Sequence, residues 1–175
     1  MKYIILFLLG ALLATQPLAA QVKQATAAPT VDPNAPYVKD KRIPPFSLTS
    51  IDGKEITNKQ LPTQYKYTCI IIFSPDCSHC EHEASELSKN ADKFKEVLFI
   101  WDSYREMDAI KKFAVKYKLA GQPNVVIGRD AAFTIPTFFR PKMTPFVAMY
   151  KNGYLLRVWE QGAEVNELIK IVQGN

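Results

Sequence analysis

The chain has 175 residues, of which 47% are hydrophobic and 22% charged, a composition typical of a globular domain that buries its own core. Three cysteines are too few for a scaffold held together by disulfides. The net charge of +5 is not gathered into basic runs with interleaved aromatic residues, so nucleic acid is not an expected partner.

The first 20 residues have the layout of a secretory signal peptide. Lys2 precedes an apolar run over residues 3–14, and the small residues Ala19 and Ala20 offer a cleavage site. This run is shorter than the roughly 20 residues that a membrane span needs. We therefore expect export to the periplasm or another extracytoplasmic site, with only transient membrane contact through this segment; an uncleaved N-terminal anchor is the alternative.

Residues 21–41 are rich in Ala, Pro, Thr and Gln, which is typical of a flexible linker. The globular domain is accordingly expected over residues 42–175. It opens with apolar residues that alternate with polar ones on either side of Asp52-Gly53. This pattern predicts a small N-terminal β-hairpin.

Two continuous apolar runs, over residues 68–73 and 97–101, predict strands that are buried on both faces, as in the middle of a parallel sheet. A shorter strand is expected over residues 125–127. Apolar residues within 107–117 recur at helical spacing, so a helix is predicted between the second and third strands. A strand-helix-strand order requires a crossover and favours parallel pairing.

The end of the chain predicts a second hairpin and a final helix. Strands are expected over residues 146–150 and 154–159 around the turn signal Asn152-Gly153, and an amphipathic helix over residues 165–172. The whole pattern predicts an α/β domain, with a central mixed sheet flanked by helices.

The sequence Cys77-Ser78-His79-Cys80 directly follows the first buried run and opens a predicted helix. One face of that helix is apolar and is formed by Cys80, Ala84, Leu87, Ala91 and Phe94. Cys80 is therefore expected to be buried, and Cys77 to lie at the exposed first turn. A C-x-x-C motif in this setting is typical of thiol–disulfide exchange.

Disulfide exchange needs a reachable thiolate and a shielded second thiol. The unpaired N–H groups of a helix N-terminus stabilise a thiolate, which suits Cys77 as the nucleophile. Cys80 would then attack only after a mixed disulfide has formed, as the resolving cysteine. A structural disulfide between the two would close too small a loop to stabilise the fold much.

A zinc or copper site is the alternative use of this motif. Cys77, His79, Cys80 and His82 are four candidate ligands, but they cluster within six residues. On a regular helix both histidines would point away from the apolar face that carries Cys80. His82 is then interpreted as a surface residue, and Cys69, inside the first apolar run, as a buried unreactive thiol.

With these residues in view, the region from Pro45 to Val172 resembles the thioredoxin superfamily, and within it the exported TlpA-like thiol–disulfide oxidoreductases. The resemblance rests on the run from Phe73 to Cys80 and on the Asp52-Gly53-Lys54 turn. It implies a thioredoxin-like fold and an enzyme without cofactor or metal. It also implies protein disulfide substrates, an unidentified redox donor and a monomer.

The superfamily places a cis-proline opposite the C-x-x-C motif, in front of a strand that ends in a Lys-Asn-Gly turn. Pro136 and Pro145 are the candidates, and the turn at 151–153 selects Pro145 by register. The resemblance thus implies a cis Thr144–Pro145 bond, with the backbone of Thr144 docking a substrate chain.

The chain departs from thioredoxin at two positions. Asp76 stands where thioredoxins have Trp before the first cysteine, and Ile71 where they bury an Asp. Glu83, at a position where TlpA-like proteins often carry an acid, is the substitute expected to assist deprotonation of Cys80. The alternative is a solvated carboxylate on the surface of the helix.

His79 precedes the second cysteine, as in oxidising DsbA-like motifs, and would favour the thiolate of Cys77 if it faced that sulfur. Arg140 and Lys142 are interpreted as solvated surface charges near the loop to Pro145. We expect exchange with disulfides of exported proteins, in the reducing direction. A peroxiredoxin-like peroxidase is a further alternative, but its P-x-x-x-T-x-x-C pattern is absent around Cys77.

Overall fold

The computed structural model of the protein describes residues 32–174. The predicted signal peptide and the first part of the predicted linker lie outside these residues. No helix in the described part of the chain is long and apolar enough to cross a membrane.

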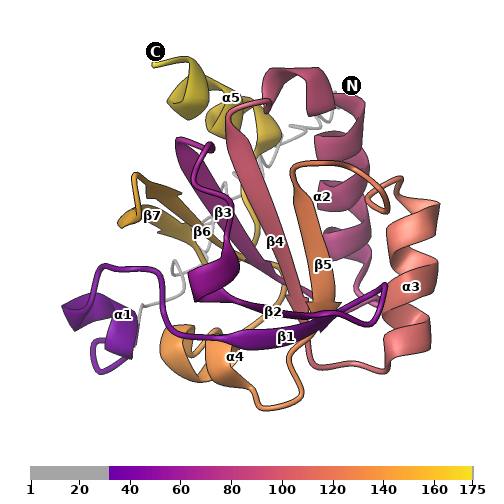
Figure 1. The fold of residues 1–175 in the computed structure, drawn as a ribbon. Helices are drawn as coiled ribbons and strands as arrows, with labels where there is room; N and C mark the ends of the chain where they lie inside the picture. The colour runs from indigo at the N-terminus through magenta and orange to yellow at the C-terminus, as the bar shows by residue number, and fades with distance from the viewer. Residues whose placement is uncertain (1–31, 175) are drawn as a thin grey trace, which may run out of the picture.

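The described residues form one mixed seven-stranded sheet in the order β2-β1-β5-β4-β3-β6-β7 (Figure 1). The central strands β3, β4 and β5 are parallel, and the remaining pairs are antiparallel. The strands are β1 (Ser47–Ser50), β2 (Glu55–Thr57), β3 (Tyr67–Ile72), β4 (Val97–Ser103), β5 (Val125–Arg129), β6 (Phe146–Lys151) and β7 (Tyr154–Trp159). The predicted hairpins and central parallel strands are confirmed.

Helices cover both faces of the sheet, so that strands β3 and β4 are buried on each side. One core lies under α2, α3 and α5, and the other under α1 and α4. The helices are α1 (Pro36–Lys39), α2 (Ser78–Lys89), α3 (Met107–Lys116), α4 (Thr134–Phe139) and α5 (Val165–Gln173), with single 3-10 turns at Asn58–Gln60 and Ala91–Lys93.

The predicted linker over residues 21–41 is wrong for its last part. Residues 36–39 form α1, which begins with Pro36, a residue suited to the first helical turn. Tyr37 is only 3% exposed and packs its ring near Phe139 and Phe146. The ordered domain therefore begins before residue 42, because one aromatic side chain docks a segment whose composition is otherwise typical of a linker.

Two other helices differ from the sequence prediction. The helix expected from Cys80 through Phe94 ends at Lys89 and is followed by a 3-10 turn, although Phe94 is still fully buried. Helix α4 was not predicted, because its sequence is short and contains Pro136. Proline is tolerated there since it lies in the first turn, where no intrahelical N–H bond is lost.

Gly128 on β5 allows the N-terminal hairpin to join the sheet. It lies opposite Ser50 of β1, and a Cβ atom placed on it would clash with the backbone oxygen of Thr49 and lie 2.7 Å from Cδ1 of Leu48. Only a residue without a side chain permits this approach.

We predict that Gly128→Ala lowers the free energy of unfolding by about 3 kcal/mol, because the added methyl group meets backbone that cannot move aside. Gly153→Ala is the matched control: the site is open but its φ is +79°, so strain alone should cost about 1 kcal/mol. Urea denaturation measures both. Equal losses in the two variants would contradict the close packing of β1 on β5.

Candidate active site

Cys77 caps the N-terminus of α2. The buried strand β3 ends at Ile72, a five-residue loop follows, and α2 begins at Ser78. The Sγ atom of Cys77 accepts a hydrogen bond from the backbone N–H of Cys80 at 3.3 Å. The sulfur thus lies where the helix dipole and an N–H group without a partner inside the helix favour a negative charge.

Cys80 is completely buried in the core beneath α2, as the apolar face of the predicted helix indicates. Burial, followed by its hydrogen bond with Cys77, raises the pKa of the Cys80 thiol to about 12. Both thiols are free, and Cys77 is half-buried. The two sulfurs of the motif therefore differ in access, and burial disfavours the thiolate of Cys80, which is the asymmetry that thiol–disulfide exchange requires.

The Thr144–Pro145 peptide bond is cis, in agreement with the sequence prediction for Pro145, whereas Pro136 lies in α4. The thiol of Cys77 donates a hydrogen bond to the carbonyl oxygen of Thr144 at 3.4 Å. The loop before β6 is therefore in direct contact with the first cysteine, although residue 144 is far from it in the sequence.

Glu83 lies in the interior, where its side chain is only 4% exposed. Its Oε1 accepts a hydrogen bond from the N–H of Ala163 at 3.1 Å, and its buried Oε2 has no partner among the described residues. Burial raises the pKa of this carboxyl group to about 7, against the opposing effect of the Ala163 hydrogen bond. The alternative interpretation, a solvated carboxylate, is wrong.

Gly162 brings Glu83 and the cis-proline together. A Cβ atom placed on this glycine would lie 3.0 Å from Cγ of Pro145 and 3.2 Å from Oε2 of Glu83. Glu83, Thr144 and Pro145 line the same cavity of about 320 Å³, together with His79. The predicted acid, docking residue and cis-proline thus form one site beside the dithiol.

The histidines lie on the outside of α2. His79 and His82 are exposed and line the mouth of the cavity beside Pro145. In the described part of the chain, three or more His, Cys, Asp or Glu side chains do not gather where they could hold a metal ion. The four candidate ligands that the sequence offered around Cys77 are therefore not brought together.

The charges around the motif are compensated by partners that the sequence did not reveal. Asp76 pairs with Arg105, and its pKa is lowered by hydrogen bonds from Ser74 and from Arg105. Arg140 forms an exposed ion pair with Asp32 at 3.3 Å. Asp76 and Arg140 therefore add little uncompensated potential at the thiol, and Arg140 is a surface charge as expected.

Cys69 lies on β3 in the same core as Cys80 and is completely buried. Burial, with a smaller contribution from the nearby Glu83 carboxylate, raises its pKa well above the ordinary value for a thiol. A thiol in this environment is protonated and inaccessible, which agrees with the interpretation of Cys69 as an unreactive core residue.

Sequence reasoning missed two buried acids on the other face of the sheet. Asp102 is fully buried, and neither of its carboxylate oxygens has a partner among the described residues; burial and the nearby Asp130 raise its pKa well above the usual range. Its backbone oxygen accepts the N–H of Phe73 at 2.9 Å, where the active-site loop begins. The signal available in the sequence was Asp102 directly after the apolar run 97–101, and Asp130 three residues after the run 125–127.

Comparison with known proteins agrees with this architecture. Residues 40–139 match the AhpC/TSA family over more than half of the chain. The chain belongs to the AhpC/TSA family. A search of curated proteins gave no match. The cis-proline loop and the C-terminal hairpin and helix lie beyond the matched residues, so the dithiol and Glu83 fall inside the family match, and Pro145 outside it.

Three solved structures illustrate the range of proteins that share this fold. A secreted disulfide oxidoreductase of Mycobacterium tuberculosis has a TM-score of 0.62 and 23% identity, over 74% of this chain and 96% of that one. A peroxiredoxin-like protein of Aquifex aeolicus has a TM-score of 0.61 and 17% identity, over 77% of this chain and 85% of that one. Arabidopsis thaliana ScoI, solved with copper bound, has a TM-score of 0.56 and 17% identity, over 74% of this chain and 94% of that one. These similarities confirm the thioredoxin-like fold.

Glu83 should make the stability of the domain depend on pH. Its pKa in the folded state, about 7, exceeds the ordinary value of 4.5, so the fold loses stability as pH rises from about 4.5 to about 7. We predict that Glu83→Gln raises the free energy of unfolding at pH 8 by up to about 3 kcal/mol and leaves it unchanged at pH 4. Urea titrations at the two pH values measure this; an equal effect at both would contradict a buried, titrating carboxyl group.

Proposed function

We propose that the protein is a thiol–disulfide oxidoreductase that acts on disulfides of exported proteins at an extracytoplasmic site, as a monomer. The observation that carries the proposal is the unequal pair of thiols at the start of α2. Cys77 is accessible and hydrogen-bonded to the Cys80 N–H, while Cys80 is buried with its pKa raised to about 12. This inequality assigns attack to Cys77 and resolution to Cys80.

In the reducing direction, the Cys77 thiolate attacks one sulfur of a substrate disulfide. A mixed disulfide forms, and the other substrate sulfur leaves as a thiolate. Cys80 then loses its proton and attacks Sγ of Cys77, which releases the second substrate thiolate and leaves a Cys77–Cys80 disulfide. The substrate gains two electrons, and an unidentified donor returns the enzyme to the dithiol form.

Two neighbours support these steps. The backbone of Thr144, next to cis-Pro145, already contacts the Cys77 sulfur and would dock the substrate segment there. Glu83, with a pKa of about 7, is suited to accept a proton at neutral pH, and it lies three residues after Cys80 on the same helix. His79 is exposed and would act on the redox potential only through long-range charge.

A peroxidase is the second candidate, because the AhpC/TSA match favours it. In that case a peroxide would oxidise the Cys77 thiolate to a sulfenic acid. The Cys80 thiol would then condense with this sulfenic acid, forming the same disulfide and releasing water. The two functions differ in the substrate that oxidises the reduced enzyme. This substrate is a protein disulfide for the oxidoreductase and a peroxide for the peroxidase. A copper- or zinc-binding chaperone would instead retain stoichiometric metal through Cys77 and Cys80.

The exchange reaction makes distinct predictions for the three cysteines. Reduction of insulin disulfides should fall at least about 100-fold in Cys77→Ser, because the nucleophile is lost. Cys80→Ser should accumulate a mixed disulfide between Cys77 and the substrate, visible by mass spectrometry. Cys69→Ser is the matched control and should retain activity, since this thiol is protonated and buried.

Hydrogen peroxide consumption is measured on the same variants. Fast peroxide turnover with slow insulin reduction would replace the proposal with the peroxidase, and retained metal without exchange would replace it with the chaperone. The equilibrium potential of the Cys77–Cys80 couple sets the direction: roughly −270 mV is typical of a reductant and roughly −120 mV of an oxidant.

The role of Glu83 predicts a pH dependence of the resolving step. In the wild-type protein, the rate of release from a preformed mixed disulfide should rise with pH around an apparent pKa near 7, because the carboxylate must be ionised to accept the proton. In Glu83→Gln this inflection should vanish and the rate at pH 7 should fall by about tenfold to 100-fold. Stopped-flow measurement with a fluorescent mixed disulfide tests it. An unchanged inflection would mean that another group accepts the proton.

A further inference from the structure

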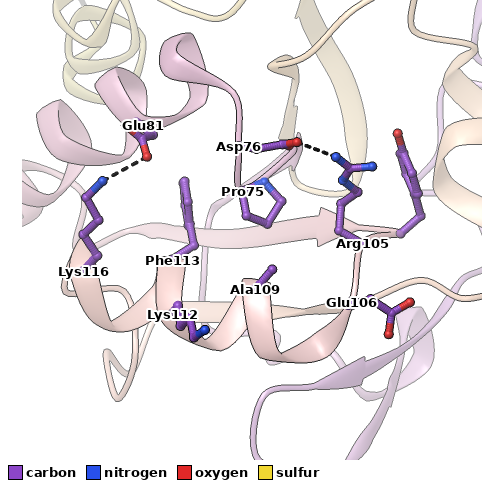
Figure 2. Close-up of a pocket in the computed structure, with 10 residues that line it drawn as sticks. Pro75, Asp76, Glu81, Arg105, Glu106, Ala109, Lys112, Phe113 and Lys116 are labelled. Atoms are coloured by element: carbon purple, nitrogen blue, oxygen red, sulfur yellow. Dashed lines mark hydrogen bonds and ion pairs between the residues drawn. The ribbon is translucent and has the colours of Figure 1, made fainter.

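A groove of about 600 Å³ runs along the first turn of α2 and the length of α3 (Figure 2). Pro75 and Asp76, the two residues before Cys77, form part of its wall. The groove has no lining residue in common with the cavity beside Pro145. It is therefore a separate surface that reaches the nucleophilic cysteine through the active-site loop.

The floor of the groove is apolar and its mouth carries exposed aromatic rings. Phe113 and Ala109 of α3 form the floor together with Pro75, as the close-up shows (Figure 2). Tyr104 lines the groove, is 38% exposed and stacks on the exposed ring of Phe133, with 4.8 Å between the ring centroids. Adjacent exposed aromatic rings are unusual on a surface that stays in contact with water, and they indicate a contact site.

The carboxylates along the groove are already paired with cations. Asp76 binds Arg105 and Glu81 binds Lys116 across the groove, as Figure 2 shows. Glu106 pairs with Arg129 at 3.0 Å. These pairs leave no free negative charge on the groove among the described residues.

Lys112 of α3 also lines the groove, and no carboxylate in the described part of the chain pairs with it. Its ammonium group is exposed, on the same helix as the Phe113 floor. The surface next to Cys77 therefore combines an apolar floor, an aromatic mouth and one uncompensated positive charge. A ligand that complements it carries a large apolar group beside a negative charge.

We propose that this groove docks a polypeptide segment of the substrate, with a large apolar side chain on the floor and an acidic side chain on Lys112, close to the cysteine that reacts with Cys77. The inference rests on the proposed function, because it specifies which substrate segments that function selects. Phosphate or another small anion would make no apolar contact with the floor. A purely basic segment would be repelled by the positive charge of Lys112.

The experiment compares two disulfide-bonded peptides of equal length, one with Phe-Asp and one with Ala-Lys a few residues from the cysteine. The wild-type protein should reduce the Phe-Asp peptide at least about tenfold faster at low salt, with most of the gain from burial of the aromatic ring. Lys112→Glu should reduce this ratio by about fivefold, because it places a negative charge against the acidic side chain.

Lys111→Glu is the matched control, because Lys111 is exposed on the same helix but does not line the groove. It should keep the wild-type ratio of the two rates. Ala109→Phe is the second variant: it fills the floor and should remove the preference for the aromatic side chain, with thermal unfolding as the check that the domain is intact.

Docking and chemistry are separated by two further measurements. Binding of a Phe-Asp peptide with serine in place of cysteine, followed by NMR shifts on α3, tests the groove without any exchange. Reduction of bis(2-hydroxyethyl) disulfide, which has no peptide chain, tests the proposed function without the groove. Equal rates for the two peptides, or equal ratios in Lys111→Glu and Lys112→Glu, would overturn the groove. No reduction of the peptides or of the small disulfide would overturn the function.

Discussion

The backbone N–H of Cys80 donates a hydrogen bond to Sγ of Cys77, and this bond ties the reactive sulfur to the first turn of α2. The bond exists because α2 begins at Ser78, directly after the loop that follows β3. The same position turns the sulfur toward the carbonyl oxygen of Thr144 and leaves it accessible. The position of this one atom decides the roles proposed for the cis-proline loop, for Glu83 and for the groove along α3.

Holding the helix there requires a rigid base, and the central parallel strands provide it. Ile72 is paired with Asp102 across β3 and β4, and the next N–H along, that of Phe73, is bound to the Asp102 oxygen. Glu83 and Asp102 lie on opposite faces of this sheet. Each has a buried carboxylate oxygen without a hydrogen-bond partner among the described residues. Each costs folding free energy when ionised, so the fold tolerates destabilising acids close to the loop that carries the thiol.

The sequence was sufficient for the features that depend on local patterns. Continuous apolar runs predicted β3 and β4, and the apolar face of α2 predicted the burial of Cys80. The cis-proline was implied by the resemblance to thioredoxins, and the Lys-Asn-Gly turn then selected Pro145 by register. It failed where long-range packing decides: Tyr37 docks part of an apparent linker, and Asp130 supports α4 by accepting the N–H of Ile135. The Asp76–Arg105 pair and the groove were equally hidden, because they join segments that only the crossover brings together.

Gly162 has a consequence for engineering. Since its missing side chain lets the buried acid and the cis-proline approach the same point, a substitution there displaces both groups at once. The proposed proton acceptor and the proposed docking loop are thus linked at a single backbone position in the loop after β7. If the proposed groove selects substrates, directed evolution could tune that selectivity along α3 without changing the dithiol, whereas changes at residue 162 would alter the surroundings of Glu83 and Pro145 together.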